Sequence, residues 1–327
     1  MGEERAVNVG PAGIEVAYER LGDPQAPPVL LVMGIGAQMI GWPDGFCAEL
    51  VGRGLQVIRF DNRDTGLSTH FRDAPPPDFV AALGGDTSSA AYTLSDMAAD
   101  CVGLLDALGL DGAHVVGASL GGAIAQTAAL EHPGRVRSLT SVMSTTGDPV
   151  VGRARPDALL AFGGPSPANR EEVIARTVRI GRALDASAFP FDEAAAADRA
   201  GRSYDRDHDP VGVTRQAVAS LASGDRTARL RELAVPTLVI HGADDPMCEV
   251  SGGRATAEAI AGADLVVIDG MGHGLPEALW PRIATLVADL VHRVESARGD
   301  LRPPAAGGRP ERVPAGGAEC LVDDGRG

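Results

Sequence analysis

The most informative feature of the chain is a serine between two glycines, in the segment AHVVGASLGG at residues 113–122. An apolar run that predicts a strand stops at Gly117, and a helix-like stretch begins after Ser119. This G-x-S-x-G pattern is typical of a strained turn that exposes a serine hydroxyl as a nucleophile. In such a turn a Cβ atom at Gly117 or Gly121 would collide with neighbouring backbone. The pattern predicts acyl transfer, which also requires a base and a site for the oxyanion.

A base for this serine is expected beyond the last strand of the fold, and His273 best meets that position. It lies in the segment DGMGHG, which follows the last predicted strand. From there a histidine can reach a serine on a central strand of the same sheet. The alternative interpretation is a loop histidine that hydrogen-bonds only to backbone. The other histidines have less suitable places: within a strand (His114), at a helix end (His132), in apparently exposed stretches (His70, His292), on the strand before the acid (His241) and in the helical region 147–232 (His208).

An acid should orient the histidine, and where this serine turn joins a parallel sheet the usual chain order is serine, acid, histidine. The loop HGADDP follows the penultimate predicted strand and offers two aspartates. We favour Asp245 as the partner of the Nδ1–H of His273, because Pro246 holds the residue before it extended. Asp244 remains an alternative on the same geometric ground. Asp148, just past an earlier strand, is a third candidate.

Two backbone amides are expected to bind the oxyanion. Leu120 follows the serine directly at a helix N-terminus, where the helix dipole favours negative charge. The second amide should come from the turn after the predicted strand 29–32, and we choose Ile35, which follows a Met-Gly pair. The alternative is that this turn is only a flexible connection. The polar segment 61–68, DNRDTGLS, is interpreted as structural, with its arginine and carboxylates tying the loop together.

Strand-like and helix-like segments alternate along the chain, which predicts a mostly parallel sheet flanked by helices. Predicted strands cover residues 13–19, 29–32, 56–60, 113–116, 136–143, 237–241 and 265–268. Predicted helices cover residues 44–51, 93–108, 120–132, 170–183, 192–203, 254–260 and 281–296. The expected division is a first part of the core at 1–146, a helical cap at 147–232 inserted before the penultimate strand, a second part of the core at 233–298 and a disordered C-terminal tail at 299–327.

The composition disfavours several classes of protein. The 327 residues contain 29 basic and 44 acidic side chains, and the formal net charge of −15 disfavours binding to nucleic acid or to anionic membrane surfaces. No apolar run approaches the roughly 18 residues of a membrane span, and the polar start predicts cytoplasmic residence. The 4 cysteines and 7 histidines lack the spacing of a zinc site or a disulfide scaffold. We therefore expect free thiols, no metal and no cofactor.

From about residue 10 to residue 296 the chain resembles the α/β-hydrolase superfamily, and within it the aclacinomycin methylesterase-like bacterial hydrolases. The motifs that carry the resemblance are GASLG, DNRDTGLS, ADDP, GMGH, LVMG, GWPD and PTLVI. The resemblance implies that Ser119 is the nucleophile, Asp245 the orienting acid and His273 the base. It also implies that the amides of Ile35 and Leu120 form the oxyanion hole.

The residues and the resemblance predict a serine hydrolase that cleaves a carboxylic ester of a small, largely apolar or aromatic molecule through an acyl-enzyme intermediate. Epoxide hydrolases and haloalkane dehalogenases carry aspartate at this turn, so Ser119 disfavours both. Alternatives are another reaction on the same triad, as in a lactonase, a perhydrolase or a lyase, and a low-turnover ligand-binding receptor. The expected partner is a small-molecule ester, and the sequence leaves open whether the chain is a monomer or a homo-oligomer.

Overall fold

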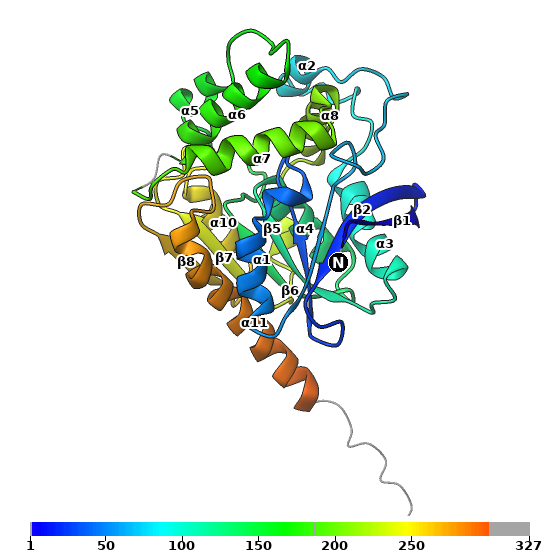
Figure 1. The fold of residues 1–327 in the computed structure, drawn as a ribbon. Helices are drawn as coiled ribbons and strands as arrows, with labels where there is room; N and C mark the ends of the chain where they lie inside the picture. The colour runs from blue at the N-terminus through cyan, green and yellow to red at the C-terminus, as the bar shows by residue number, and fades with distance from the viewer. Residues whose placement is uncertain (1, 186–187, 301–327) are drawn as a thin grey trace, which may run out of the picture.

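Eight strands form one sheet in the computed structural model, which describes residues 2–185 and 188–300 (Figure 1). Their spatial order is β1-β2-β4-β3-β5-β6-β7-β8. β2 runs antiparallel to β1 and β4, and every neighbouring pair from β4 to β8 is parallel, which confirms the mostly parallel sheet. The strands span Glu4–Val9 (β1), Ile14–Leu21 (β2), Pro28–Val32 (β3), Gln56–Phe60 (β4), Ala113–Ala118 (β5), Val136–Val142 (β6), Thr237–Gly242 (β7) and Asp264–Ile268 (β8).

Helices cover both faces of the sheet, and the central strands are buried throughout. Such continuous apolar runs are expected of parallel strands with helices on each side. α3 and α4 pack on one face through side chains such as Leu104 and Ile124, and α1 and α11 pack on the other through Phe46 and Val287. The helices of the core span Asp44–Val51 (α1), Leu94–Ala107 (α3), Leu120–Glu131 (α4), Ser251–Ala259 (α10) and Trp280–Asp300 (α11).

A group of helices separates β6 from β7 along the chain and lies over one end of the sheet (Figure 1). It comprises Pro156–Ala161 (α5), Arg170–Asp185 (α6), Glu193–Arg206 (α7), Pro210–Ser223 (α8) and Thr227–Leu230 (α9). This group, called the cap below, contacts the loops that follow β3 and β8. It therefore lies at the carboxyl edge of the parallel strands, where ligands bind in sheets of this kind.

Three features depart from the sequence prediction. β1 is not predicted, because only Ala6 and Val9 of this edge strand are buried and no clean apolar alternation results. The short helix Phe79–Leu83 (α2) lies in a region whose proline and glycine content predicts a loop. α11 continues to Asp300, so the predicted tail begins inside a helix, and residues 301–327 lie outside the described residues. Across the described chain, no helix combines the length and the apolar character that a membrane crossing needs.

One buried histidine links the sheet to its covering helix. His114 of β5 is 1% exposed, with Nδ1 2.7 Å from Ser138 Oγ and Nε2 3.2 Å from Glu295 Oε1 of α11. Burial lowers the pKa of His114 from 6.5 to about 4. In the unfolded chain the ring binds a proton as the pH falls through 6.5, whereas the folded protein keeps it neutral until about pH 4. The stability of the fold should therefore fall as the pH falls through this window.

We expect the substitution His114→Gln to reduce the acid sensitivity of folding. Between about pH 7.5 and about pH 5 the wild-type protein should lose about 2 kcal/mol of unfolding free energy through this histidine, and the variant should not lose that part. Urea unfolding at the two pH values measures the difference. His292→Gln, at an exposed position of α11, is the control and should match the wild type. An equal acid-induced loss in H114Q and wild type would contradict this role.

Candidate active site

Ser119 stands on a strained turn between β5 and α4. Its backbone has φ 55° and ψ −121°, a conformation that residues with a side chain rarely adopt. A Cβ on Gly117 would overlap the carbonyl oxygen of Gly121, and a Cβ on Gly121 would overlap that of Val32. The close approach of three backbone segments therefore requires both glycines, and it holds the serine at the N-terminus of α4.

The side chains of Ser119 and Asp245 contact opposite nitrogens of His273. Ser119 Oγ lies 3.0 Å from His273 Nε2, and Asp245 Oδ2 lies 2.7 Å from His273 Nδ1. The three residues follow β5, β7 and β8, so the carboxyl ends of parallel strands bring together positions far apart in the chain. A carboxylate on Nδ1 holds a proton there and leaves Nε2 free to accept the serine proton.

The candidate acids differ in what their carboxylates bind. Asp245 is buried, and its Oδ1 accepts hydrogen bonds of 2.9 and 2.8 Å from the amides two and three residues later. Asp244 accepts instead from the amide of Gly270 at 2.9 Å. Asp148 accepts from an amide of its own loop at 2.8 Å. Among these three acids, Asp245 is the one that accepts the hydrogen bond of His273.

A second histidine lies beside the acid. The Nε2 of His241 is 2.7 Å from the carbonyl oxygen of Cys248 and 3.5 Å from Asp245 Oδ2. Because the carbonyl can only accept, Nε2 carries the proton of that hydrogen bond. Burial lowers the pKa of His241, which favours the neutral ring. This residue thus holds the loop of the acid, while its ring adds no fixed charge next to Asp245.

The prediction that His70 is exposed is wrong. Its Nδ1 is 2.7 Å from Asp209 Oδ2 at the start of α8, and its Nε2 is 2.9 Å from a carbonyl oxygen of the core. Asp64 completes a group whose possible ligand atoms lie within 4.8 Å of one another. However, Asp64 accepts hydrogen bonds from Tyr92 and Arg215, and both His70 nitrogens are already paired. These contacts favour a hydrogen-bonded link between core and cap over a metal site.

The two amides predicted for the oxyanion hole lie next to the serine. Leu120 begins α4, with Ser119 as its N-cap residue. The loop of residues 33–36 lies against the serine, because a Cβ on Gly34 would be 3.2 Å from the Cβ of Ser119. Within the described part of the chain, the amides of Ile35 and Leu120 donate to no protein acceptor. Both are therefore free to bind a negative oxygen.

The polar segment 61–68 fastens the loops around the site. Asn62 Nδ2 donates a 3.0 Å hydrogen bond to the carbonyl oxygen of Met33, at the start of the loop that carries Ile35. Arg63 forms two hydrogen bonds, of 2.6 and 2.8 Å, with the carboxylate of Asp100 on α3. The segment thus makes the structural contacts expected of it. The sequence pattern does not single out Asn62 itself. Its place in this polar segment is the one feature that could have indicated its structural role.

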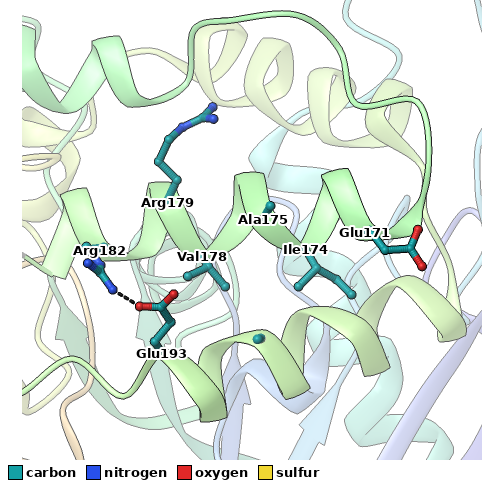
Figure 2. A pocket seen from close by; sticks show the side chains of 8 residues that line it. Glu171, Ile174, Ala175, Val178, Arg179, Arg182 and Glu193 are labelled. Carbon is teal, nitrogen blue, oxygen red and sulfur yellow. Dashed lines mark hydrogen bonds and ion pairs between the residues drawn. The ribbon is translucent and has the colours of Figure 1, made fainter.

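A groove of about 550 Å³ lies between α6 and α7 of the cap (Figure 2). Ile174 and Val178 point from α6 toward α7 in it, and Arg182 pairs with Glu193 across one end. None of the predicted catalytic residues lines this groove. We interpret it as the packing seam of two amphipathic helices, separate from the site at Ser119.

The sequence of residues 27–277 matches the protein family described as alpha/beta hydrolase fold. The chain belongs to the α/β-hydrolase family. Among curated relatives, this α/β-hydrolase is 32% identical to the rhodomycin D methylesterase DnrP of Streptomyces peucetius. The alignment spans 296 residues and covers 82% of this chain and 92% of DnrP. It is 31% identical to the rhodomycin D methylesterase DauP of Streptomyces sp. strain C5, with the same coverage.

Solved structures agree on the fold of this α/β-hydrolase. The meta-cleavage product hydrolase of Pseudomonas fluorescens IP01 matches it with a TM-score of 0.68 and 20% identity, over 89% of this chain and 98% of that one. At that identity the match shows the fold alone. The family match and the curated relatives make the chain a hydrolase of the α/β-hydrolase type that has esterases among its relatives.

We expect the two neighbouring aspartates to differ sharply in their effect on the serine. Asp245→Asn should slow covalent labelling of Ser119 by a fluorophosphonate by about a hundredfold or more, because an asparagine does not stabilise the imidazolium that forms as the serine loses its proton. Asp244→Asn should change the rate by less than about threefold. Intact-protein mass spectrometry over time measures both rates. Similar rates in the two variants would contradict the assignment of the acid.

Proposed function

We propose that this protein hydrolyses a carboxylic ester through an acyl-enzyme intermediate on Ser119. The observation that carries the proposal is the continuous set of contacts from Ser119 Oγ through His273 to Asp245, at 3.0 and 2.7 Å. The serine lies on a strained turn that exposes its hydroxyl, beside two amides that donate to no acceptor among the described residues. Nucleophile, base, orienting acid and oxyanion donors are the parts that acyl transfer requires.

Each group has a definite part in the proposed reaction. His273 Nε2 takes the proton of Ser119 as Oγ attacks the ester carbonyl, and Asp245 stabilises the imidazolium that forms. The amides of Ile35 and Leu120 bind the negative oxygen of the tetrahedral intermediate. The imidazolium then protonates the departing alcohol. A water molecule that is deprotonated by the same histidine attacks the acyl-enzyme, and the acid is released with the serine restored.

The relatives and the surroundings of the site support an apolar or aromatic ester as the substrate. Both curated methylesterases are named for the methyl ester of rhodomycin D, which favours a methyl ester here. Apolar side chains border the loop of residues 33–36. Ile35 is 42% exposed, and Val213 of α8, which is 37% exposed, lies next to Gly36. The net charge of −15 disfavours an anionic substrate at long range.

We expect the wild-type protein to hydrolyse p-nitrophenyl esters. When esters of equal size are compared, we expect it to prefer the methyl ester of a bulky aromatic acid. Ser119→Ala should lower kcat by roughly a thousandfold or more, because the nucleophile is removed while the fold is kept. Asp148→Asn is the matched control and should retain kcat within about threefold. Product analysis should show one acid and one alcohol for each ester consumed.

The proposal fails if S119A retains wild-type turnover. It also fails if the wild-type protein binds these esters without consuming them, which would indicate a receptor. Consumption of an ester without release of the free acid would point to another reaction on the same residues.

A further inference from the structure

One buried side chain of the cap binds the loop that carries the proposed oxyanion donor. Gln216 of α8 is 0% exposed, and its Oε1 accepts a 2.8 Å hydrogen bond from the amide of Gly36. Its Nε2 donates to the carbonyl oxygen of Arg63 at 2.8 Å and to Thr65 Oγ1 at 2.6 Å. An amide N–H faces one end of the side chain and a carbonyl oxygen faces the other, so its orientation is fixed. Both polar atoms of this buried side chain are thereby hydrogen-bonded.

These hydrogen bonds bracket a single peptide group. Upstream, Asn62 of the core binds the carbonyl oxygen of Met33 at 3.0 Å. Downstream, Gln216 of the cap binds the amide of Gly36 at 2.8 Å. The peptide between these two anchors carries the N–H of Ile35. The carbonyl oxygen of that peptide accepts a 3.2 Å hydrogen bond from the amide of Ala37 in the same loop. One side chain from the core and one from the cap fix the peptide groups on either side of it.

We propose that Gln216 is a positioning residue through which the docked cap sets the direction of the Ile35 amide for the oxyanion. The inference rests on the proposed function, because it concerns the same oxyanion hole. Gln216 touches no reacting atom and acts only through residues 33–36. Oxyanion donors are effective when they are fixed before the reaction, so a loop that loses one anchor should stabilise the transition state less.

Contacts other than those of Gln216 also fasten the cap to the core. His70 binds Asp209 at the start of α8 at 2.7 Å. Gly212 packs so closely that a Cβ on it would lie 2.6 Å from the carbonyl oxygen of Asp64. Methionine has nearly the length of glutamine without its hydrogen bonds, so Gln216→Met should fold with the cap in place. It should lose the anchor on Gly36 together with the hydrogen bonds to Arg63 and Thr65.

Gln38 provides a matched control for cap docking. It is 4% exposed, and its Nε2 donates to the carbonyl oxygens of Ser203 and Asp207 in the cap at 2.8 and 3.0 Å. Gln38→Met thus removes buried glutamine hydrogen bonds between core and cap, but it leaves both anchors of residues 33–36 intact. A role limited to docking the cap predicts similar kinetic effects for the two variants.

The test uses the full chain and a p-nitrophenyl ester. We expect Q216M to lower kcat roughly tenfold to a hundredfold with KM changed by less than about threefold, and Q38M to lower kcat by less than about threefold. A trifluoromethyl ketone forms a bond between its carbonyl carbon and Ser119 Oγ, while His273 takes the serine proton and the ketone oxygen becomes an oxyanion. Its affinity should fall in Q216M in proportion to kcat/KM and stay near wild type in Q38M.

The outcomes distinguish failure of this inference from failure of the proposed function. If the wild type is active, S119A is inactive, and Q216M equals either the wild type or Q38M in kcat and in affinity for the ketone, the role of Gln216 is overturned while the proposed function stands. If the wild type hydrolyses no ester, or S119A remains active, the proposed function fails and this inference fails with it. A loss in Q216M that appears only in KM also overturns the inference.

Discussion

The close approach of backbone segments around Ser119 is the constraint on which the rest of the site depends. α4 can begin directly after β5 only because Gly117 and Gly121 lack side chains that would overlap neighbouring carbonyl oxygens. The serine is thereby held at φ 55°, a conformation that costs on the order of 1–3 kcal/mol and persists only where the surrounding structure fixes it. The buried strands β3 and β6, on either side of β5, hold this turn in place. The same turn places the hydroxyl near His273, and it leaves the first amide of α4 without an acceptor in residues 2–185 and 188–300.

The remaining parts of the site come from loops that core and cap hold together. The amide of His273 donates to the carbonyl oxygen of Leu184 at the end of α6, at 2.8 Å. The loop of residues 33–36 is bound by Asn62 from the core and by Gln216 from α8. The cap is therefore part of the geometry around the serine as well as its cover. A change in the position of the cap would therefore change the alignment of the groups proposed to do the chemistry.

Much of this arrangement follows from local sequence patterns, and the rest depends on contacts between distant segments. The buried parallel strands are predictable because apolar runs alternate with helical segments, and the order serine, acid, histidine follows from their places after β5, β7 and β8. By contrast, the partly buried position of His70 depends on Asp209, which is 139 positions away, so no nearby residue indicates it. The contact of Gln216 with Gly36 spans 180 positions, and a polar residue in a helix gives no sign of its partner. β1 is not predicted, because an edge strand with few buried residues lacks a clear alternation of apolar and polar residues.

The central claim is that Ser119 becomes covalently acylated during turnover. Rapid mixing with a p-nitrophenyl ester, followed by acid quenching and intact-protein mass spectrometry, tests it most directly. We predict a burst of p-nitrophenol that approaches one equivalent of protein, with a matching mass increase by the acyl group that maps to Ser119. Turnover with no acylated protein at any time, or with the acyl group on another residue, would contradict the account.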